Sequence, residues 1–276
     1  MISINNNKCT GCGLCSKNCH RNQIKIINSK AVPINKSCIG CGHCIAICPQ
    51  NAVVIDNYDM KELVEYNPET FYVNPDNLLN VIKFRRSVRK FKNTTVEKEK
   101  IKKIIEAGRF SPSGSNKQPL SFIVVQQKMK ELTRITVKIL YKFACSFEPD
   151  ENDPLLRHHK LYIDMWKQIY MNYKHGEDNL FFNAPALIII LHDKRLSAYS
   201  TIDGQLATSN MLLMANLLGL GVCYNGFFTF ASEDVEIRNF LFLPDNINVV
   251  ASLLIGYSDI NYLRTVPRKK PEVQWM

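Results

Sequence analysis

The sequence predicts a small cysteine-rich domain followed by a larger domain of mixed helices and strands. Eight of the ten cysteines lie within the first fifty residues of this 276-residue chain. Residues 57–74 are polar and interrupted by Asn and Pro, and the chain beyond them alternates between helical and strand-like apolar patterns. We therefore expect a first domain over residues 1–56, a linker over 57–74 and a second domain over 75–276.

The composition is typical of a globular protein, with 46% hydrophobic and 22% charged residues. The longest apolar run, 184–191, contains a proline and is too short to span a membrane. The first eight residues are polar and lack the apolar stretch of a signal peptide. We therefore expect a cytoplasmic protein that has no membrane partner.

The chain carries a net charge of +10, from 35 basic and 25 acidic residues. A basic balance can indicate a nucleic-acid partner, but here the Lys and Arg residues are interleaved with Asp and Glu. No basic helix with interleaved aromatic residues is present. We therefore expect no nucleic-acid binding.

The cysteines follow the spacing C-x2-C-x2-C-x3-C twice, and the flanking glycines repeat with them. This duplication predicts two similar halves, each with a cysteine loop, a short helical turn and a strand. Three closely spaced cysteines can wrap one face of a [4Fe-4S] cluster, while the fourth points away and ligates the other cluster. The expected ligand sets are Cys9, Cys12, Cys15 and Cys48 for one cluster, and Cys38, Cys41, Cys44 and Cys19 for the other.

Zinc is the alternative occupant, but zinc sites usually pair two C-x2-C units across a longer loop. The duplicated motif resembles that of the bacterial two-cluster ferredoxins, and the resemblance covers residues 1 to about 56.

The first domain contains six Lys and Arg residues and a single acid, Asp56. A basic electron-transfer domain would attract an acidic carrier such as flavodoxin or another ferredoxin. Alternatively, these lysines only keep a small domain soluble.

The second domain should begin with a helix that has Asn74 as its N-cap and Pro75 at its first position. The helix runs into the basic segment 85–91, which is either a solvated turn or a grip for a phosphate group, since Arg offers a bidentate fork. A second helix, with Ile101, Ile104, Ile105 and Phe110 on one face, leads to a polar loop over 111–119. A strand over 121–126 follows.

The R-R-S-x-R segment after a helix and the P-S-x-x-N-x-Q-P loop before a strand resemble the nitroreductase family of FMN enzymes. Further segments agree in order and spacing: N-A-P-A before a strand over 187–191, a long, largely buried helix over 203–218, the stretch 219–227, and a strand over 249–257. The resemblance covers about 81 to 276. It implies an α+β fold with a mainly antiparallel sheet flanked by helices, and a homodimer with two FMN sites at its interface.

The resemblance also implies roles for individual residues. It places Arg85 and Ser87 near the FMN phosphate and ribityl chain, and Arg89 beside flavin N1. Arg86, between them, is also expected to bind the cofactor. The backbone of Tyr224, Asn225 and Gly226 would face flavin N5. The remaining expected FMN contacts are Ser113, Ser115 and Asn116, from the other subunit, with Arg268 and Lys270 completing the phosphate grip.

Residues 127–180 fit the family pattern least well, and the equivalent region of the family is variable and covers the flavin. Its aromatic and histidine residues would then form a substrate lid, or alternatively pack in the core or a dimer interface. They are Trp166, Tyr162, Tyr170, Tyr173, His158 and His159. We expect the two isolated cysteines, Cys145 and Cys223, to be buried thiols.

Together the motifs predict an oxidoreductase in which two [4Fe-4S] clusters pass electrons to FMN, which reduces a nitroaromatic, quinone or similar conjugated acceptor. In one alternative, NAD(P)H reduces the flavin and the clusters serve as an electron outlet. The chain has no G-x-G-x-x-G after a strand and no P-loop, so no dedicated dinucleotide domain is visible. The resemblance implies that NAD(P)H would instead bind transiently in the acceptor site. In a further alternative, the chain is a non-catalytic electron-transfer or redox-sensing flavoprotein.

Overall fold

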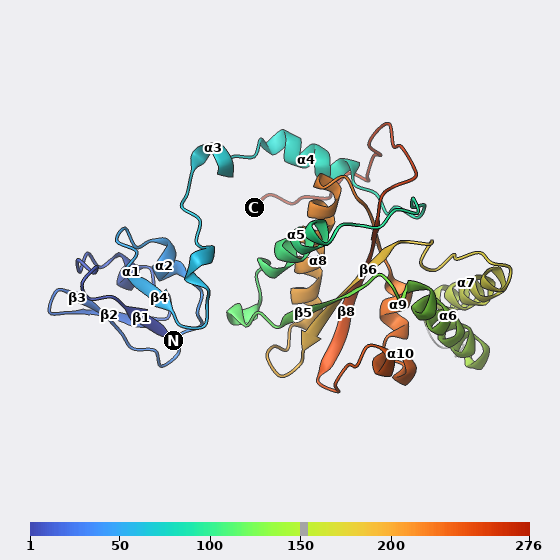
Figure 1. Ribbon diagram of the computed structural model, residues 1–276, viewed down its shortest axis with the longest axis horizontal. Coiled ribbons are helices and arrows are strands. Elements are labelled where there is room, and N and C mark those ends of the chain that lie inside the picture. The colour runs from blue at the N-terminus through green and yellow to red at the C-terminus, as the bar shows by residue number, and fades with distance from the viewer. Residues whose placement is uncertain (150–153) are drawn as a thin grey trace. The chain divides into compact units, whose positions relative to one another are not determined.

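The computed structural model describes residues 1–149 and 154–276, which form two compact units (Figure 1). The first unit comprises Met1–Tyr72 with Ser115–Lys117, and the second comprises Val73–Gly114 and Gln118–Met276. Among the described residues, no helix is both long and apolar enough to cross a membrane.

The first unit contains two copies of a strand–helix–strand pattern, as the duplicated cysteine motif predicts. The first copy is β1 (Ile2–Ile4), α1 (Leu14–Lys17) and β2 (Ile24–Ile27), and the second is β3 (Lys30–Pro33), α2 (His43–Ala46) and β4 (Val53–Ile55). β1 pairs with β4 and β2 with β3, both antiparallel. Apolar side chains from the strands pack with the thiols of Cys15 and Cys44 to form a small core. The predicted linker includes η1 (Met60–Glu62) and α3 (Pro68–Phe71).

Glycines start both helical turns of the first unit. Gly13 and Gly42 take left-handed conformations, with φ of 78° and 77°, immediately before α1 and α2. In the first cysteine loop, a Cβ on Gly11 would collide with the backbone carbonyl of Ser29. These glycines are therefore required for the chain to turn tightly between successive cysteines.

The second unit is organised around a four-stranded antiparallel sheet with the strand order β5-β6-β8-β7. Its strands are β5 (Leu120–Val125), β6 (Ala186–Asp193), β7 (Gly221–Tyr224) and β8 (Ile247–Gly256). β6 is buried on both faces, because Leu187 and Ile189 point into one core and Ile188 and Ile190 into the other. This sheet confirms the expected antiparallel α+β architecture.

Helices cover both faces of this sheet (Figure 1). One face packs against α5 (Lys98–Arg109) and α8 (Ser200–Leu217), and the other against α6 (Met129–Ser146), α7 (Leu156–Lys174), α9 (Gly226–Ala231) and α10 (Val235–Phe240). The chain enters the unit through α4 (Pro75–Phe84). The predicted cap is confirmed, since the Asn74 side chain accepts a hydrogen bond of 3.0 Å from the backbone N–H of Asn77.

Three expectations about burial were wrong. Phe110 is 69% exposed because it follows the last residue of α5 as its C-cap and leaves the buried face. Cys145 is exposed, since it follows the buried Ala144 on α6 and is therefore rotated about 100° from it. The helix expected to be largely buried, α8, is covered on only one of its faces within the single chain. Ile202 and Leu217 on its other face are 59% and 61% exposed. Cys223 is buried, as predicted.

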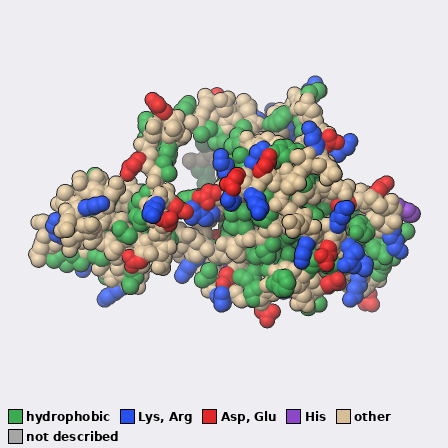
Figure 2. All heavy atoms as spheres, viewed as in Figure 1, with side chains coloured by type: hydrophobic (Ala, Val, Ile, Leu, Met, Phe, Trp, Pro, Cys, Tyr) green, Lys and Arg blue, Asp and Glu red, His purple; other side chains and the backbone are tan. Residues whose placement is uncertain are grey.

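Basic and acidic side chains are interspersed on the face of the protein in Figure 2. No broad single-sign patch of the kind that binds nucleic acid is visible on that face.

Candidate functional site

The eight N-terminal cysteines line two separate cavities in the first unit. One cavity is lined by Cys9, Cys12, Cys15 and Cys48, and the other by Cys19, Cys38, Cys41 and Cys44. The fold thus brings the last cysteine of each motif to the first three cysteines of the other motif. These are the two quartets expected from the sequence.

Backbone N–H groups point at cysteine sulfurs at matching places in the two motifs. The N–H of Gln23 donates to Cys19 Sγ at 3.2 Å, and the N–H of Ala52 donates to Cys48 Sγ at 3.3 Å. Hydrogen bonds of this kind stabilise negative charge on a ligating sulfur and are one of the protein's means of setting a cluster's potential.

The cysteine thiols differ in their electrostatic surroundings. Backbone hydrogen bonds, chiefly from Ala31, lower the pKa of Cys9, whereas burial raises the pKa of Cys44 to about 11. Near neutral pH such a thiol keeps its proton unless a metal centre displaces it. Within the described part of the chain, no three His, Cys, Asp or Glu side chains converge closely enough to hold a single metal ion. Each cysteine quartet therefore surrounds a space, which fits a cluster better than one zinc ion.

The R-R-S-x-R segment lies beside β7. Ser87 forms an isolated parallel bridge with Val222, and the N–H of Val88 donates to the carbonyl of Val222 at 3.0 Å. Burial raises the pKa of the neighbouring Cys223 thiol, while the positive charge of Arg89 and hydrogen bonds from Ser87 and Arg89 act in the opposite direction. The side chains of Ser87 and Arg89 thus meet at the thiol of Cys223, next to the segment that starts at Tyr224.

Arg86 lies apart from these side chains. Its Nη1 donates to the backbone carbonyls of Lys83 and Arg85 at 2.9 and 2.6 Å, which caps the C-terminus of α4. Its Nη2 is buried and has no hydrogen-bond partner among the described residues. Arg86 lines a different cavity of about 230 Å³, together with Asn216 and Ser258.

Hydrogen bonds fix Asn225 at the start of α9. Its backbone N–H donates to the carbonyl of Ser252 at 2.9 Å, and its own carbonyl accepts from the Ser252 hydroxyl at 2.8 Å. Its side chain donates to the carbonyl of Leu180 and accepts from the N–H of Phe228. Because the polar groups of Asn225 are already engaged, Gly226 is the better candidate in this segment to meet a ligand. The N–H groups in the first turn of a helix have no partner within that helix.

The polar loop over 111–118 contains backbone conformations that few residues adopt. Ser115, Asn116 and Gln118 all have positive φ, at 51°, 54° and 48°. The Ser113 hydroxyl accepts a hydrogen bond of 2.9 Å from the N–H of Gln118. Ser115–Lys117 groups with the first unit, where the Asn116 side chain donates to the carbonyl of Gly40 at 3.0 Å.

A buried acid that the sequence analysis missed holds the start of this loop. Asp203, 2% exposed at the first turn of α8, accepts hydrogen bonds of 3.0 Å from the N–H of Gly114 and from the Ser197 hydroxyl. His192 is fully buried with its Nε2 4.0 Å from Asp203 Oδ2, and neither ring nitrogen has a hydrogen-bond partner among the described residues. Burial lowers the pKa of His192, with Asp203 acting in the opposite direction. The available signal was a single acid in the first turn of a helix that has no other charged residue.

The last two expected FMN contacts, Arg268 and Lys270, are exposed in a C-terminal segment that has no helix or strand.

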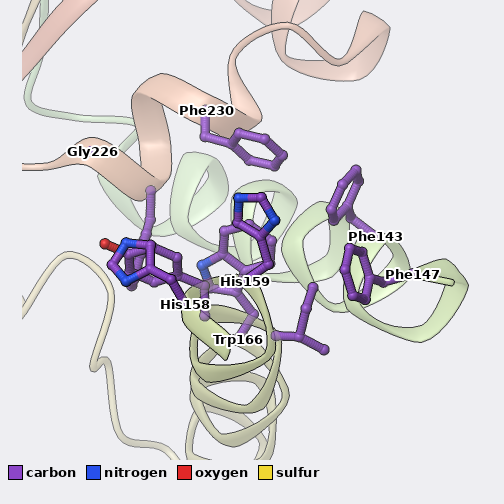
Figure 3. Close-up of a pocket in the computed structure, with 10 residues that line it drawn as sticks. Phe143, Phe147, His158, His159, Trp166, Gly226 and Phe230 are labelled. Carbon is purple, nitrogen blue, oxygen red and sulfur yellow. The ribbon is translucent and has the colours of Figure 1, made fainter. Parts of the chain in front are cut away.

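Residues that were expected to form a lid or to pack in the core line a cavity of about 530 Å³ (Figure 3). Its aromatic lining comes from α6, α7 and α9: Phe143, Phe147, Tyr162, Trp166, Phe227 and Phe230. His158, His159, Ile163 and Gly226 complete the lining. The inward side chains of α6 and α7 also pack against the sheet.

Comparison with known proteins agrees with this arrangement. The model of the Nitroreductase family matches residues 82–257, which is more than half of the chain, and a model of a 4Fe-4S dicluster domain matches residues 1–49. The chain belongs to the nitroreductase family. It carries in addition an N-terminal dicluster domain, so that the fold expected from the sequence is confirmed.

Curated relatives and a solved structure give similar matches. The chain is 29% identical over 196 residues to a 4-nitrobenzoate reductase from Pseudomonas putida, which covers 66% of this chain and 85% of the relative. It is 27% identical over 197 residues to a nitrobenzene nitroreductase from Ectopseudomonas oleovorans, covering 65% and 86%. A crystal structure of a nitroreductase with bound FMN from Desulfitobacterium hafniense DCB-2 has 25% identity and a TM-score of 0.54, and the match covers 74% of this chain and 100% of that one.

This member of the nitroreductase family is therefore an oxidoreductase whose cofactors are FMN and two [4Fe-4S] clusters, with eight N-terminal cysteines available for the clusters. The residues present fit both groups. Four thiols border each cavity of the first unit, and a hydroxyl and a cationic side chain meet beside the exposed end of β7.

Proposed function

We propose that this nitroreductase-family protein reduces a nitroaromatic, quinone or other conjugated acceptor, with electrons passing from the two clusters to FMN. Clusters carry single electrons, whereas a flavin exchanges either one or two. The observation that carries the proposal is the presence of two four-cysteine cavities in the same chain as a nitroreductase domain. The overall reaction consumes two electrons and two protons for each quinone reduced to hydroquinone, or for each nitro group reduced to nitroso with release of water.

The cysteine quartets are proposed to ligate the clusters as they are grouped around the two cavities. Each cluster then depends on cysteines from both copies of the motif, so neither copy is expected to hold a cluster alone. The backbone N–H groups that donate to the sulfurs of Cys19 and Cys48 occupy equivalent places in the two motifs. They would stabilise the negative charge on one ligand of each cluster in the same way.

Arg85, Ser87 and Arg89 are proposed to hold FMN. Alternate residues of an extended segment point to the same side, and Arg86, which lies between them, is instead engaged with the end of α4. Arg85 would hold the phosphate, and Arg89 would stabilise negative charge at N1 of the reduced flavin.

Further FMN contacts are proposed from other segments. The N–H of Gly226 is assigned to flavin N5, because that of Asn225 already donates to Ser252. Arg268 and Lys270 would extend the phosphate grip from the C-terminal segment. The loop with Ser113, Ser115 and Asn116 would contribute from a second subunit.

A homodimer is proposed because the single chain leaves apolar faces uncovered. On α4, Leu78, Leu79 and Ile82 are 40%, 45% and 46% exposed, and Ile202 on α8 is 59% exposed. Contiguous apolar surface of this kind usually marks an interface. Light scattering on the purified protein should give twice the chain mass of 31.7 kDa, and a monomer at micromolar concentration would contradict this assembly.

The electron donor is tested by anaerobic reduction of the purified protein. Absorbance of flavin and clusters is followed while reduced ferredoxin, NADH or NADPH is added separately. The proposal predicts rapid bleaching of both chromophores by reduced ferredoxin, followed by turnover when the acceptor is added. Flavin reduction by NAD(P)H alone would favour the route in which the clusters act as outlet, and reduction without turnover on any acceptor would favour an electron carrier or sensor.

A further inference from the structure

The cavity between α6, α7 and α9 has walls that are aromatic and mutually braced. The rings of Trp166 and Phe230 lie 5.0 Å apart at an interplanar angle of 26°, and Phe143 meets Phe230 edge-on at 5.0 Å and 81°. Tyr162 and Trp166 both contact Phe227 edge-on, at 5.6 and 5.7 Å. Such contacts hold the rings in place before a ligand arrives, which lowers the entropic cost of binding.

The shape and size of the cavity suit a small flat molecule. Figure 3 shows the side chains of Phe143, His159, Trp166 and Phe230 arranged around one space. The volume of about 530 Å³ falls within the range of small-molecule sites. A single substituted benzene or naphthalene ring would find apolar faces to stack against on several sides.

The lining contains no Lys, Arg, Asp or Glu among the residues that the structure describes. The polar side chains in the lining are those of His158, His159 and Tyr162, together with the Trp166 indole. Trp166 is 6% exposed, and its Nε1 is buried without a hydrogen-bond partner among the described residues. An ionised carboxylate buried here would lose its hydration without gaining a fixed cation, which is costly, whereas a neutral ring would not.

The cavity also borders the proposed flavin site. Gly226, to which flavin N5 is assigned, is one of its lining residues, and the next residue, Phe227, forms part of its aromatic wall. A ring held in the cavity would therefore lie beside the reacting edge of the cofactor. Gly226 presents no side chain between the two.

We propose that this cavity is the acceptor pocket, and that it selects flat aromatic acceptors without charge over acceptors whose ring carries a carboxylate. Trp166, Phe143 and Phe230 are the specificity-determining residues. The inference rests on the proposed function, because it takes the cavity to be the acceptor side of that flavin reaction.

Binding to the oxidised, FMN-loaded full-length protein tests the selectivity without any turnover. Equilibrium dialysis with nitrobenzene and with 4-nitrobenzoate compares two probes that differ only by the carboxylate. We expect nitrobenzene to bind at least tenfold more tightly, a difference of about 1.4 kcal/mol. Equal affinities, or tighter binding of 4-nitrobenzoate, would overturn the proposal.

A pair of variants tests whether the cavity itself is responsible. Phe143→Lys places a cation in the wall, and should raise the affinity for 4-nitrobenzoate relative to nitrobenzene at least tenfold. Met165→Lys is the matched control, since Met165 is 42% exposed, close to the 43% of Phe143, but does not line the cavity. The same change in both variants would indicate a general effect of net charge and would contradict the assignment.

Tryptophan fluorescence gives a second readout that does not depend on those variants folding. The chain has two tryptophans, Trp166 and the 91% exposed Trp275, so Trp275→Phe leaves Trp166 as the only one. Nitrobenzene should quench it saturably, with the dissociation constant found by dialysis, and non-saturable quenching would refute binding in the cavity. Saturable binding without any turnover would leave the pocket in place and contradict the proposed function instead.

Discussion

Replacing Asp203 by Ala should weaken FMN binding, although Asp203 is not among the expected FMN contacts. Its carboxylate accepts the N–H of Gly114, which begins the most strained part of the loop over 111–118. Without this acceptor, the loop loses the contact that holds it against α8.

The magnitude follows from the hydrogen bonds that are lost. A hydrogen bond to a charged group contributes about 1.5–3 kcal/mol. The Ser197 hydroxyl can turn to another acceptor, so only the Gly114 bond is counted. If FMN must restore the loop on binding, its dissociation constant should rise about 10- to 150-fold, since about 1.4 kcal/mol corresponds to a factor of ten.

Fluorescence titration of FMN into the flavin-free protein measures this constant. Asp203→Asn retains an oxygen for the Gly114 N–H and should lie closer to the wild type. Asp234→Ala is the matched control, because Asp234 caps α10 through a 2.8 Å bond to the N–H of Glu236, so its loss lowers stability without touching the loop. An FMN affinity of Asp203→Ala within twofold of the wild type would refute the reasoning.

Three further predictions test other parts of the account. Cys48→Ser should impair the cluster of the cavity that Cys48 lines and spare the other, as read by EPR and iron analysis; loss of the other cluster alone would contradict the grouping. Arg85→Ala should cost about 1.5–3 kcal/mol of FMN binding while Arg86→Ala retains the flavin, and equal retention by both variants would remove Arg85 from the site. Burial keeps the pKa of His192 in the folded protein below its usual value. As the pH falls through about 6.5, His192 therefore takes up a proton in the unfolded chain before it does so in the folded protein. The free energy of unfolding should then decline by up to about 1.4 kcal/mol per pH unit. Urea unfolding at pH 7.5 and 5.5 should show a smaller decline in His192→Gln, and an unchanged decline would exclude His192 as its source.

The sequence was informative wherever the chemistry is local. The cysteine spacing predicted the duplicated halves of the first unit, because consecutive ligands and glycines determine a loop within a few residues. The Asn74 cap was equally predictable, since a cap and the N–H that it accepts are three residues apart. The antiparallel sheet flanked by helices in the second unit followed from the family resemblance.

Features that depend on distant contacts were not predictable. Asp203 and Gly114 are separated by 89 residues, and hydropathy assigns both Asp203 and His192 to the surface. The helical pattern around Cys145 did not specify which face of α6 would meet the sheet. The aromatic cavity forms only where three helices converge, so its residues could be interpreted from the sequence either as a lid or as packing, without a way to choose between them.

If the clusters supply the flavin with electrons, deletion of residues 1–56 removes that supply and leaves the flavin domain. The buried cores of the second unit consist of residues from its own segments, so the truncated protein should fold and bind FMN. Steady-state reduction of one acceptor is then compared in the full-length and truncated proteins with reduced ferredoxin and with NAD(P)H as donors. Truncation should abolish turnover driven by ferredoxin and leave any turnover driven by NAD(P)H. Full retention of ferredoxin-driven turnover would contradict this expectation.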